Sequence, residues 1–230
     1  IACEIESDHL AAFGRAQHLI YIETQFLRSD PIATGLAEAA KSNPQLSLLL
    51  ILPKAPDDVL FEDNYGVDAR FGMALQAEKI DSVWRAFGTR ATLASPVKPQ
   101  LAARETAQTL CGSPVIHVHN KVLVIDDSYA HVGSANLNGR SMRWDSEASL
   151  RITDPARITT LRDRLFRHWW FTPPPQDAQA PQTLQRWWAR EISKNAVQRP
   201  ENRSGFLVPH QPEVTRDWEQ PLPGVTENIV

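Results

Sequence analysis

Residues 115–150 read VIHVHNKVLVIDDSYAHVGSANLNGRSMRWDSEASL, the most informative pattern in the chain. Branched and aromatic residues predict a strand over Val115–Ile125, a turn at residues 126–129 and a returning strand over Ala130–Val132. Glu147–Ile152 is expected to form another strand. The stretch therefore predicts adjacent strands that carry polar side chains at regular spacing.

The spacing of these polar residues brings them to one place. His119 and Lys121 are two apart, so on a strand both side chains point to the same face. Ser134 and Asn136 are also two apart, and Gly133 allows a close backbone approach beside them. An imidazole, an ammonium, a hydroxyl and an amide around one small volume would suit a phosphate group.

Two carboxylates belong to the same pattern. Asp126 falls in the turn, where it is expected to fix backbone geometry. Glu147 is expected to bond the second ring nitrogen of His119, which would set the tautomer of the ring and stabilise its cationic form. The predicted catalytic set is His119, Lys121, Asn136, Glu147 and Asp126.

Other polar residues are assigned to substrate binding. Ser134 belongs to the pattern itself, and His117 would share the face of His119. Glu23 and Gln25 alternate on a predicted strand over residues 18–26 and could reach the site from there. The alternative for His117 is a structural role, and for Glu23 and Gln25 it is pairing with buried backbone groups.

The order of elements along the rest of the chain predicts an α/β protein. The periodicity indicates an α-β-α sandwich with a mixed, mostly parallel central sheet. We expect helices over residues 4–17, 30–43, 72–87 and 155–170, a strand over 46–52, and a long loop over 53–72.

A composition change near Thr172 divides the chain. Residues 1–171 are predicted to form the catalytic half-domain, and residues 172–230 a Pro-rich C-terminal extension. Within the extension, a short helix over Leu184–Ile192 is expected to dock on one surface.

The bulk composition excludes some classes of function. With 42% hydrophobic and 22% charged residues and a net charge of -3, the chain is typical of globular proteins, and broad nucleic-acid binding is not favoured. Cys3 and Cys111 lack metal-ligand spacing, and no metal or other cofactor is expected. No apolar run is long enough to span a bilayer, which favours a soluble or peripheral membrane protein and leaves its compartment open.

The pattern His119-x-Lys121-x4-Asp126-x6-Gly-Ser-x-Asn136 resembles the signature of the phospholipase D superfamily at every fixed position. The resemblance spans about residues 4–171. It implies a phospholipase D-like fold, metal-independent cleavage of phosphodiester bonds and a phosphohistidine intermediate. In the resembled proteins, an acidic residue after the second strand has the role expected of Glu147.

The resembled active sites contain two copies of the motif, whereas this chain has one. The second copy must come from another copy of this chain or from a different polypeptide. The segment His18–Phe26, HLIYIETQF, resembles the start of the C-terminal half of lipid-cleaving members. We therefore favour another polypeptide or a missing N-terminal half, with the N-terminal half of the same enzyme as a second chain, over a homodimer.

Three functions are compatible with these observations. The first is a phospholipase D that acts at a membrane surface and hydrolyses or transfers phosphatidyl groups. The second is a homodimeric nuclease or other phosphodiesterase, or a phosphatidyltransferase that resembles cardiolipin synthase. The third is a scaffold half without catalytic activity, which the intact His119, Lys121 and Asn136 disfavour.

Overall fold

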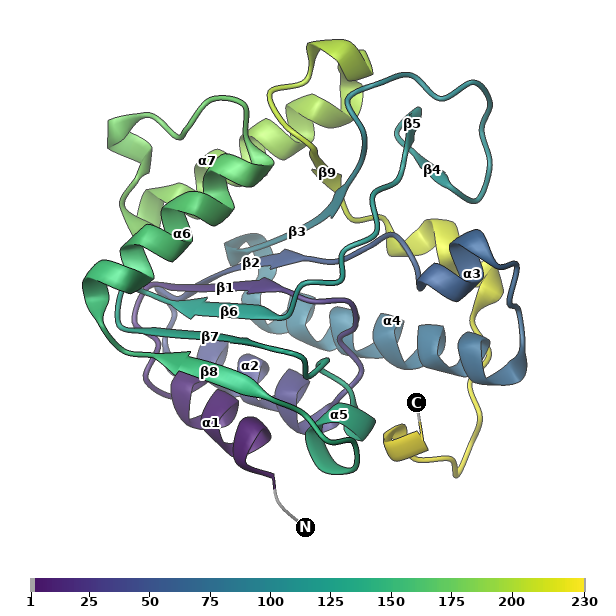
Figure 1. Cartoon of the computed structure of the whole chain (residues 1–230), viewed down its shortest axis with the longest axis horizontal. Coiled ribbons are helices and arrows are strands. Elements are labelled where there is room, and N and C mark those ends of the chain that lie inside the picture. The colour runs from purple at the N-terminus through teal and green to yellow at the C-terminus, as the bar shows by residue number, and fades with distance from the viewer. Residues whose placement is uncertain (1–2, 230) are drawn as a thin grey trace.

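A seven-stranded sheet forms the centre of the protein, and the computed structural model describes residues 3–229. The strand order is β8-β7-β6-β1-β2-β3-β9, and the strands are traced in Figure 1. The strands of this sheet are β1 (Leu19–Glu23), β2 (Ser47–Ile51), β3 (Ala91–Pro96), β6 (Val122–Ile125), β7 (Tyr129–Gly133), β8 (Ser149–Ile152) and β9 (Leu207–Pro209). A separate small hairpin pairs β4 (Thr109–Leu110) with β5 (Ser113–Pro114).

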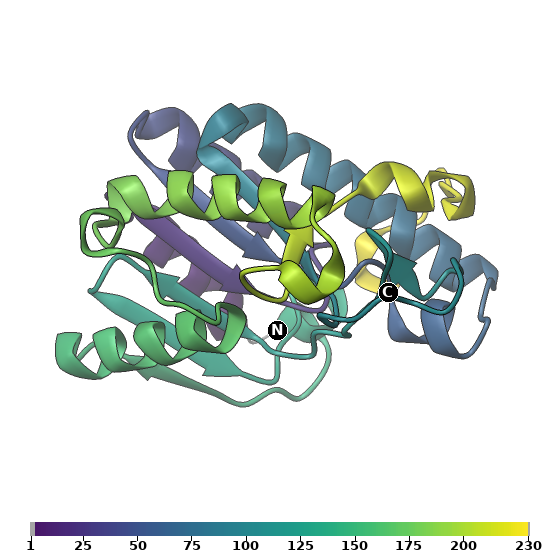
Figure 2. The ribbon, with the colours of Figure 1, turned by 90° about the horizontal axis from the view of Figure 1, so that it is seen from above.

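Helices cover both faces of the sheet, as Figures 1 and 2 show. The α-helices are α1 (Glu4–Phe13), α2 (Asp30–Ser42), α3 (Asp57–Phe61), α4 (Val67–Phe87), α5 (Gly139–Arg143), α6 (Pro155–Trp169) and α7 (Pro181–Val197). Short 3-10 helices are η1 (Gly88–Arg90), η2 (Gln176–Ala178), η3 (Pro200–Asn202), η4 (Pro212–Trp218) and η5 (Glu227–Ile229).

The two faces of the sheet bury separate apolar cores. Helices α1, α2 and α4 pack on one face around residues such as Phe13, Leu36 and Val83. Helices α6 and α7 pack on the other face, where Trp169 and Trp188 are buried. Because successive strand residues point to opposite faces, Ile22 belongs to the first core and Tyr21 to the second. The predicted α-β-α sandwich is confirmed.

The sheet is mixed, as predicted, but parallel pairing is confined to β1, β2 and β3. The pairs β1–β6, β6–β7, β7–β8 and β3–β9 are antiparallel. The tight turn after Ile125 joins β6 to β7 directly, and such a connection allows only antiparallel pairing. Parallel pairing is therefore a smaller part of the sheet than the sequence pattern predicted.

Several predicted boundaries differ from the observed ones. The predicted strand over Val115–Ile125 is regular only from Val122, because the preceding residues leave the sheet. The predicted loop over residues 53–72 contains α3 and the beginning of α4, and β3 was not predicted. Helix α6 begins where predicted, with the Asp154 side chain accepting a hydrogen bond from the backbone nitrogen of Arg157 at 2.9 Å.

The C-terminal extension is part of the same fold. Strand β9 pairs with β3 at the edge of the sheet, and α7, longer than predicted, places the fully buried Trp188 in the second core. The chain then runs beside α4 and ends near α5, as the yellow ribbon in Figure 1 shows. Residues 172–230 are therefore not a separate structural unit.

Candidate active site

His119 and Lys121 lie in an irregular segment directly before β6. The Lys121 side chain folds back and donates to the backbone carbonyl of His119 at 2.8 Å. The backbone nitrogen of Gly133, at the end of β7, donates to the carbonyl of Lys121 at 3.1 Å. These bonds hold the two halves of the motif side by side.

The Lys121 ammonium is buried next to polar side chains. Its Nζ lies 3.4 Å from Oε1 of Gln25, whose Nε2 lies 3.3 Å from a carboxylate oxygen of Asp57. Burial lowers the pKa of Lys121, and the carboxylates of Glu147 and Asp57 oppose this shift. Since an ammonium has three donors, one remains for a bound anion.

The His119 ring is exposed and makes no hydrogen bond to any residue in the described range. The ring of His117 lies beside it, with 6.3 Å between the ring centroids. Both ring nitrogens of His117 are buried without a partner among the described residues. Burial lowers the pKa of His117, and the nearby Asp57 carboxylate acts in the opposite direction. The structure therefore brings His117 next to His119, as predicted.

The second half of the motif follows β7. Gly133 permits the close approach of β8, because an added Cβ would lie 2.7 Å from the Cβ of Ser149. The Ser134 backbone nitrogen donates to the Ala148 carbonyl at 3.0 Å. The Asn136 carboxamide bonds to no described residue, and its Oδ1 is buried. A buried polar atom without a partner is rare in folded proteins and indicates a place where a ligand or water binds.

Glu147 differs from its predicted contact. Its carboxylate accepts a hydrogen bond from the Ser134 hydroxyl, and no bond joins it to His119. The reason is local, because the Ala148 backbone nitrogen also donates to the Ser134 hydroxyl at 3.0 Å, which places Glu147 beside Ser134. The predicted His119–Glu147 hydrogen bond is therefore absent from this structure, although Glu147 is close enough to Lys121 to influence its pKa.

Asp126 lies at the opposite end of β6 from His119, and its place in the catalytic set is corrected. Its carboxylate accepts hydrogen bonds of 2.8, 3.0 and 2.9 Å from the backbone nitrogens of Gln17, His18 and Leu19. It has a φ of 50°, a left-handed conformation that Asp tolerates in turns. Asp126 therefore anchors the start of β1, which is the backbone role that its turn position indicated.

Glu23 does not face the site, and its predicted contact with substrate is wrong. It is fully buried on the α6 and α7 side of the sheet. Its carboxylate accepts hydrogen bonds from the Tyr21 hydroxyl, from Trp169 Nε1 at 2.9 Å and from Asn120 Nδ2 at 2.6 Å. Gln25 does reach Lys121, so the two residues have separate roles.

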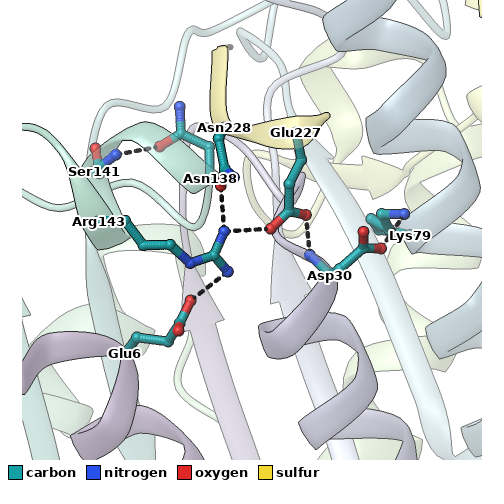
Figure 3. A network of polar contacts seen from close by, with 8 residues as sticks. All are labelled: Glu6, Asp30, Lys79, Asn138, Ser141, Arg143, Glu227 and Asn228. Carbon is teal, nitrogen blue, oxygen red and sulfur yellow. Dashed lines mark hydrogen bonds and ion pairs between the residues drawn. The ribbon is translucent and has the colours of Figure 1, made fainter. Parts of the chain in front are cut away.

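The loop after Asn136 leads into α5, and the polar network of Figure 3 joins α5 to other parts of the chain. Asn138 caps α5 by accepting a hydrogen bond from the Ser141 backbone nitrogen at 3.1 Å. Arg143, at the end of α5, pairs with Glu6 of α1 and with Glu227 of the C-terminal segment, each at 2.9 Å. Two distant parts of the chain, α1 and the C-terminal segment, therefore fix this loop.

Sequence reasoning missed two residues near the site. Asp57 lies in the predicted loop over residues 53–72, and neither Asp57 nor Asn120 is among the predicted site residues. The Asn120 side chain bonds Glu23, which lies on the α6 and α7 side of the sheet. The sequence does not show that these two residues meet. The one available signal was the position of Asn120 between His119 and Lys121.

No group of three or more His, Cys, Asp or Glu side chains within residues 3–229 is arranged to hold a metal ion. No helix in this range is both long and apolar enough to cross a bilayer. A cavity of about 930 Å³ lies between α4, β3 and the C-terminal segment, but none of the motif residues lines it. The motif side chains instead gather where β6 begins and β7 ends.

The fold and site define an α/β domain that presents a histidine, a lysine and an asparagine at one end of a mixed sheet. Residues 10–170 match the family model described as "Cardiolipin synthase, PLD-like domain". The chain therefore belongs to the phospholipase D superfamily.

Curated relatives include phospholipases D from animals and plants. Phospholipase D1 from Cricetulus griseus is 26% identical over 186 residues, which cover 69% of this chain and 18% of that protein. Phospholipase D gamma 3 from Arabidopsis thaliana is 24% identical over 203 residues, which cover 66% of this chain and 23% of that protein. The chain thus spans about a fifth of the length of these relatives.

A solved structure of phosphatidylserine synthase from Haemophilus influenzae is also similar. It is 19% identical, with a TM-score of 0.49, and the match covers 81% of this chain and 42% of that one.

Proposed function

We propose that this chain supplies one half of a phospholipase D-type active site that hydrolyses or transfers phosphatidyl groups. The observation that carries the proposal is the set of uncommitted polar groups in the motif. The His119 ring and the Asn136 carboxamide have no bonding partner among the described residues, and the Lys121 ammonium keeps a free donor. A phosphate oxygen can accept hydrogen bonds from a ring N–H of His119, from Asn136 Nδ2 and from the Lys121 ammonium.

The electrostatics of the site fit a phosphoryl group. Lys121 supplies a positive charge, and the Asn136 carboxamide supplies an N–H donor. Preorganised donors of this kind typically contribute about 3–4 kcal/mol each to transition-state stabilisation. A histidine in proton transfer adds roughly 100- to 10,000-fold in rate.

The proposed chemistry has two displacement steps. A ring nitrogen of one histidine attacks phosphorus and forms an N–P bond, while the P–O bond to the leaving alcohol breaks. A second histidine donates the proton that this alcohol needs. Water or another alcohol then attacks phosphorus and gives its proton to the second histidine, while the N–P bond to the first histidine breaks. Hydrolysis and transfer therefore share one intermediate.

The second histidine is proposed to come from an N-terminal half, supplied by a different polypeptide or as a part of the same enzyme outside these 230 residues. The chain contains one copy of the motif, and its segment over residues 18–26 resembles the start of the C-terminal half in lipid-cleaving enzymes. In that arrangement His119 is the general acid and the partner's histidine is the nucleophile. The exposure of His119 leaves it accessible to such a partner.

A substrate comparison tests this function. The active species is isolated, its composition is determined by native mass, and it is given phosphatidylcholine vesicles or plasmid DNA in the presence of a chelator. Head-group release by a complex with a second polypeptide supports the proposal. DNA cleavage by a homodimer without action on the lipid would instead identify a nuclease.

Acid quenching during turnover tests the assignment of roles. We expect the labelled phosphatidyl group on the partner's histidine. A phosphatidyl group trapped on His119 would reverse the two roles while leaving the phosphohistidine chemistry intact.

A further inference from the structure

We propose that Glu23 is a positioning residue that acts through Asn120 to hold His119 and Lys121 on the reactive face. This inference rests on the proposed function. It concerns the segment between Ile116 and β6, which carries both side chains without belonging to the sheet.

The backbone of this segment has little support of its own. Ile116 donates to the Pro96 carbonyl at 2.9 Å, and Lys121 accepts from Gly133 at 3.1 Å. Between these two points, residues 117–120 make no backbone–backbone hydrogen bond to any part of the described chain. Side chains must therefore fix its conformation.

Asn120 provides the contact that reaches a rigid part of the protein. Its Nδ2 donates to Glu23 Oε2 at 2.6 Å, and Glu23 ends β1 in the middle of the sheet. Lys121 Nζ donates to the His119 carbonyl within the segment and lies 3.4 Å from Gln25 Oε1, and the Val118 side chain is buried in the second core. The Asn120–Glu23 bond is the shortest polar contact between the segment and the core, and we infer that it sets the orientation of the segment.

Glu23 is well suited to be that anchor. It is fully buried, and its other oxygen accepts from the Tyr21 hydroxyl and from Trp169 Nε1. An ionised carboxylate accepts hydrogen bonds and donates none, so all these contacts are compatible with its charge. The network joins β1 to the end of α6, which leaves the carboxylate a single orientation.

The contacts of neighbouring side chains explain how the anchor acts. Asn120 reaches Glu23 on the α6 and α7 side of the sheet, whereas Lys121 contacts Gln25 and lies beside Ile22 of the first core. A shift of the segment by one residue would turn His119 and Lys121 towards the α6 and α7 side. Fixing Asn120 prevents this shift. Misplacement of a reacting group by about 1 Å can reduce a rate by roughly 100-fold.

The test compares Asn120→Ala with Asn43→Ala in the active complex. Asn43 is a matched control because its Nδ2 also anchors a chain segment, donating to the Gln17 carbonyl at 2.8 Å, at the other end of β1. We expect Asn120→Ala to lower kcat roughly 10- to 100-fold with little change in KM, and Asn43→Ala to leave kcat within about twofold.

Charge exchange tests the direct contact. Asn120→Asp sets two carboxylates against each other and should lower kcat further than Asn120→Ala. Adding Glu23→Gln restores a donor and an acceptor, and we expect it to recover at least about tenfold of the lost rate. Absence of recovery, or a loss of kcat that only follows the thermal midpoint across all variants, would overturn the inference.

Deuterium uptake without substrate separates this inference from the proposed function. We expect faster uptake over residues 117–121 in Asn120→Ala than in Asn43→Ala. Unchanged uptake there would refute the anchor even if the wild-type complex is an active phosphodiesterase. An inactive wild-type complex with the expected uptake would refute the proposed function instead.

Discussion

Asp126 and His119 belong to one sequence motif, yet they lie at opposite ends of β6 and have different physical roles. Asp126 bonds three consecutive backbone nitrogens at the start of β1. His119 is exposed and unbonded within the described chain. Sequence spacing alone placed both in the catalytic set, because it does not show which end of a strand faces the substrate.

Removing the Asp126 carboxylate should affect folding rather than chemistry. Hydrogen bonds to a charged group contribute about 1.5–3 kcal/mol each, and water replaces part of that at a half-buried site. We expect Asp126→Ala to lower the free energy of unfolding by about 2–4 kcal/mol, measured by urea denaturation, with kcat of the folded fraction unchanged.

The neighbouring Asp127 is the control. It is exposed and forms an ion pair with Arg162, so Asp127→Ala should cost less than about 1 kcal/mol. A kcat of Asp126→Ala reduced as strongly as that of a His119 variant would return Asp126 to the catalytic set.

The buried His9 should make the protein sensitive to acid. Burial lowers the pKa of His9 from 6.5 to about 4, and the nearby His131 adds to this effect. The folded state therefore binds fewer protons than the unfolded state, and stability is lost as pH falls from about 6.5 towards about 4. At pH 5 the expected loss from His9 is about 2 kcal/mol.

Urea unfolding at pH 7.5 and pH 5 checks this expectation. We predict a smaller difference between the two pH values in His9→Gln than in the wild type. His168→Gln is the control, because the His168 ring is exposed and should leave the difference unchanged. Equal differences in wild type and His9→Gln would contradict the assignment.

At the scale of elements, α5 is a five-residue helix whose position depends on distant residues. The network of Figure 3 joins it through Arg143 to Glu6 in α1 and to Glu227 near the C-terminus. Glu227 is itself buried and also accepts a hydrogen bond from the backbone nitrogen of Asp30. Burial raises the pKa of Glu227, and Arg143 opposes that shift.

Substitution of Arg143 should loosen this part of the protein. Arg143→Ala leaves the buried Glu227 carboxylate without its cation, and we expect a loss of about 2–4 kcal/mol in unfolding free energy. Deuterium uptake over residues 219–229 should also increase. The exposed Arg140, paired with Asp145 at 3.2 Å, is the matched control, with an expected loss below about 1 kcal/mol. Equal losses in the two variants would show that the network contributes little.

The sequence predicted elements better than the contacts between them. Periodicity located α2 and α6 almost to the residue, because each has a Pro near its start and a regular apolar stripe. It missed β3, whose residues Ala91–Pro96 include small and polar ones and lack clear alternation. It also missed Asn120–Glu23, because that contact joins residues 97 positions apart.

At the scale of the whole molecule, the C-terminal extension completes the second core. Trp188 of α7 is fully buried, and its ring packs against Phe166, Tyr21 and Trp170 at centroid distances of 5.1, 5.8 and 5.3 Å. Tyr21 in turn bonds Glu23, so the extension supports the network behind the motif. The composition change near Thr172 therefore does not mark the end of the part of the chain that supports the motif.

Trp188→Ala should destabilise the entire fold. Removing a buried aromatic side chain typically costs about 3–5 kcal/mol, whereas the half-buried Trp187 should contribute less. We expect one cooperative transition in both variants, with coincident circular dichroism and fluorescence curves. Two separate transitions would show that the extension unfolds independently.

The proposed function requires the motif to be a reacting site and not a structural feature. The most direct measurement is phosphodiester cleavage by the complete active complex carrying His119→Asn, with His168→Asn as the control. We predict a loss of at least about 100-fold in rate for His119→Asn at an unchanged thermal midpoint, and wild-type rates for His168→Asn. Wild-type activity in a folded His119→Asn complex would contradict it.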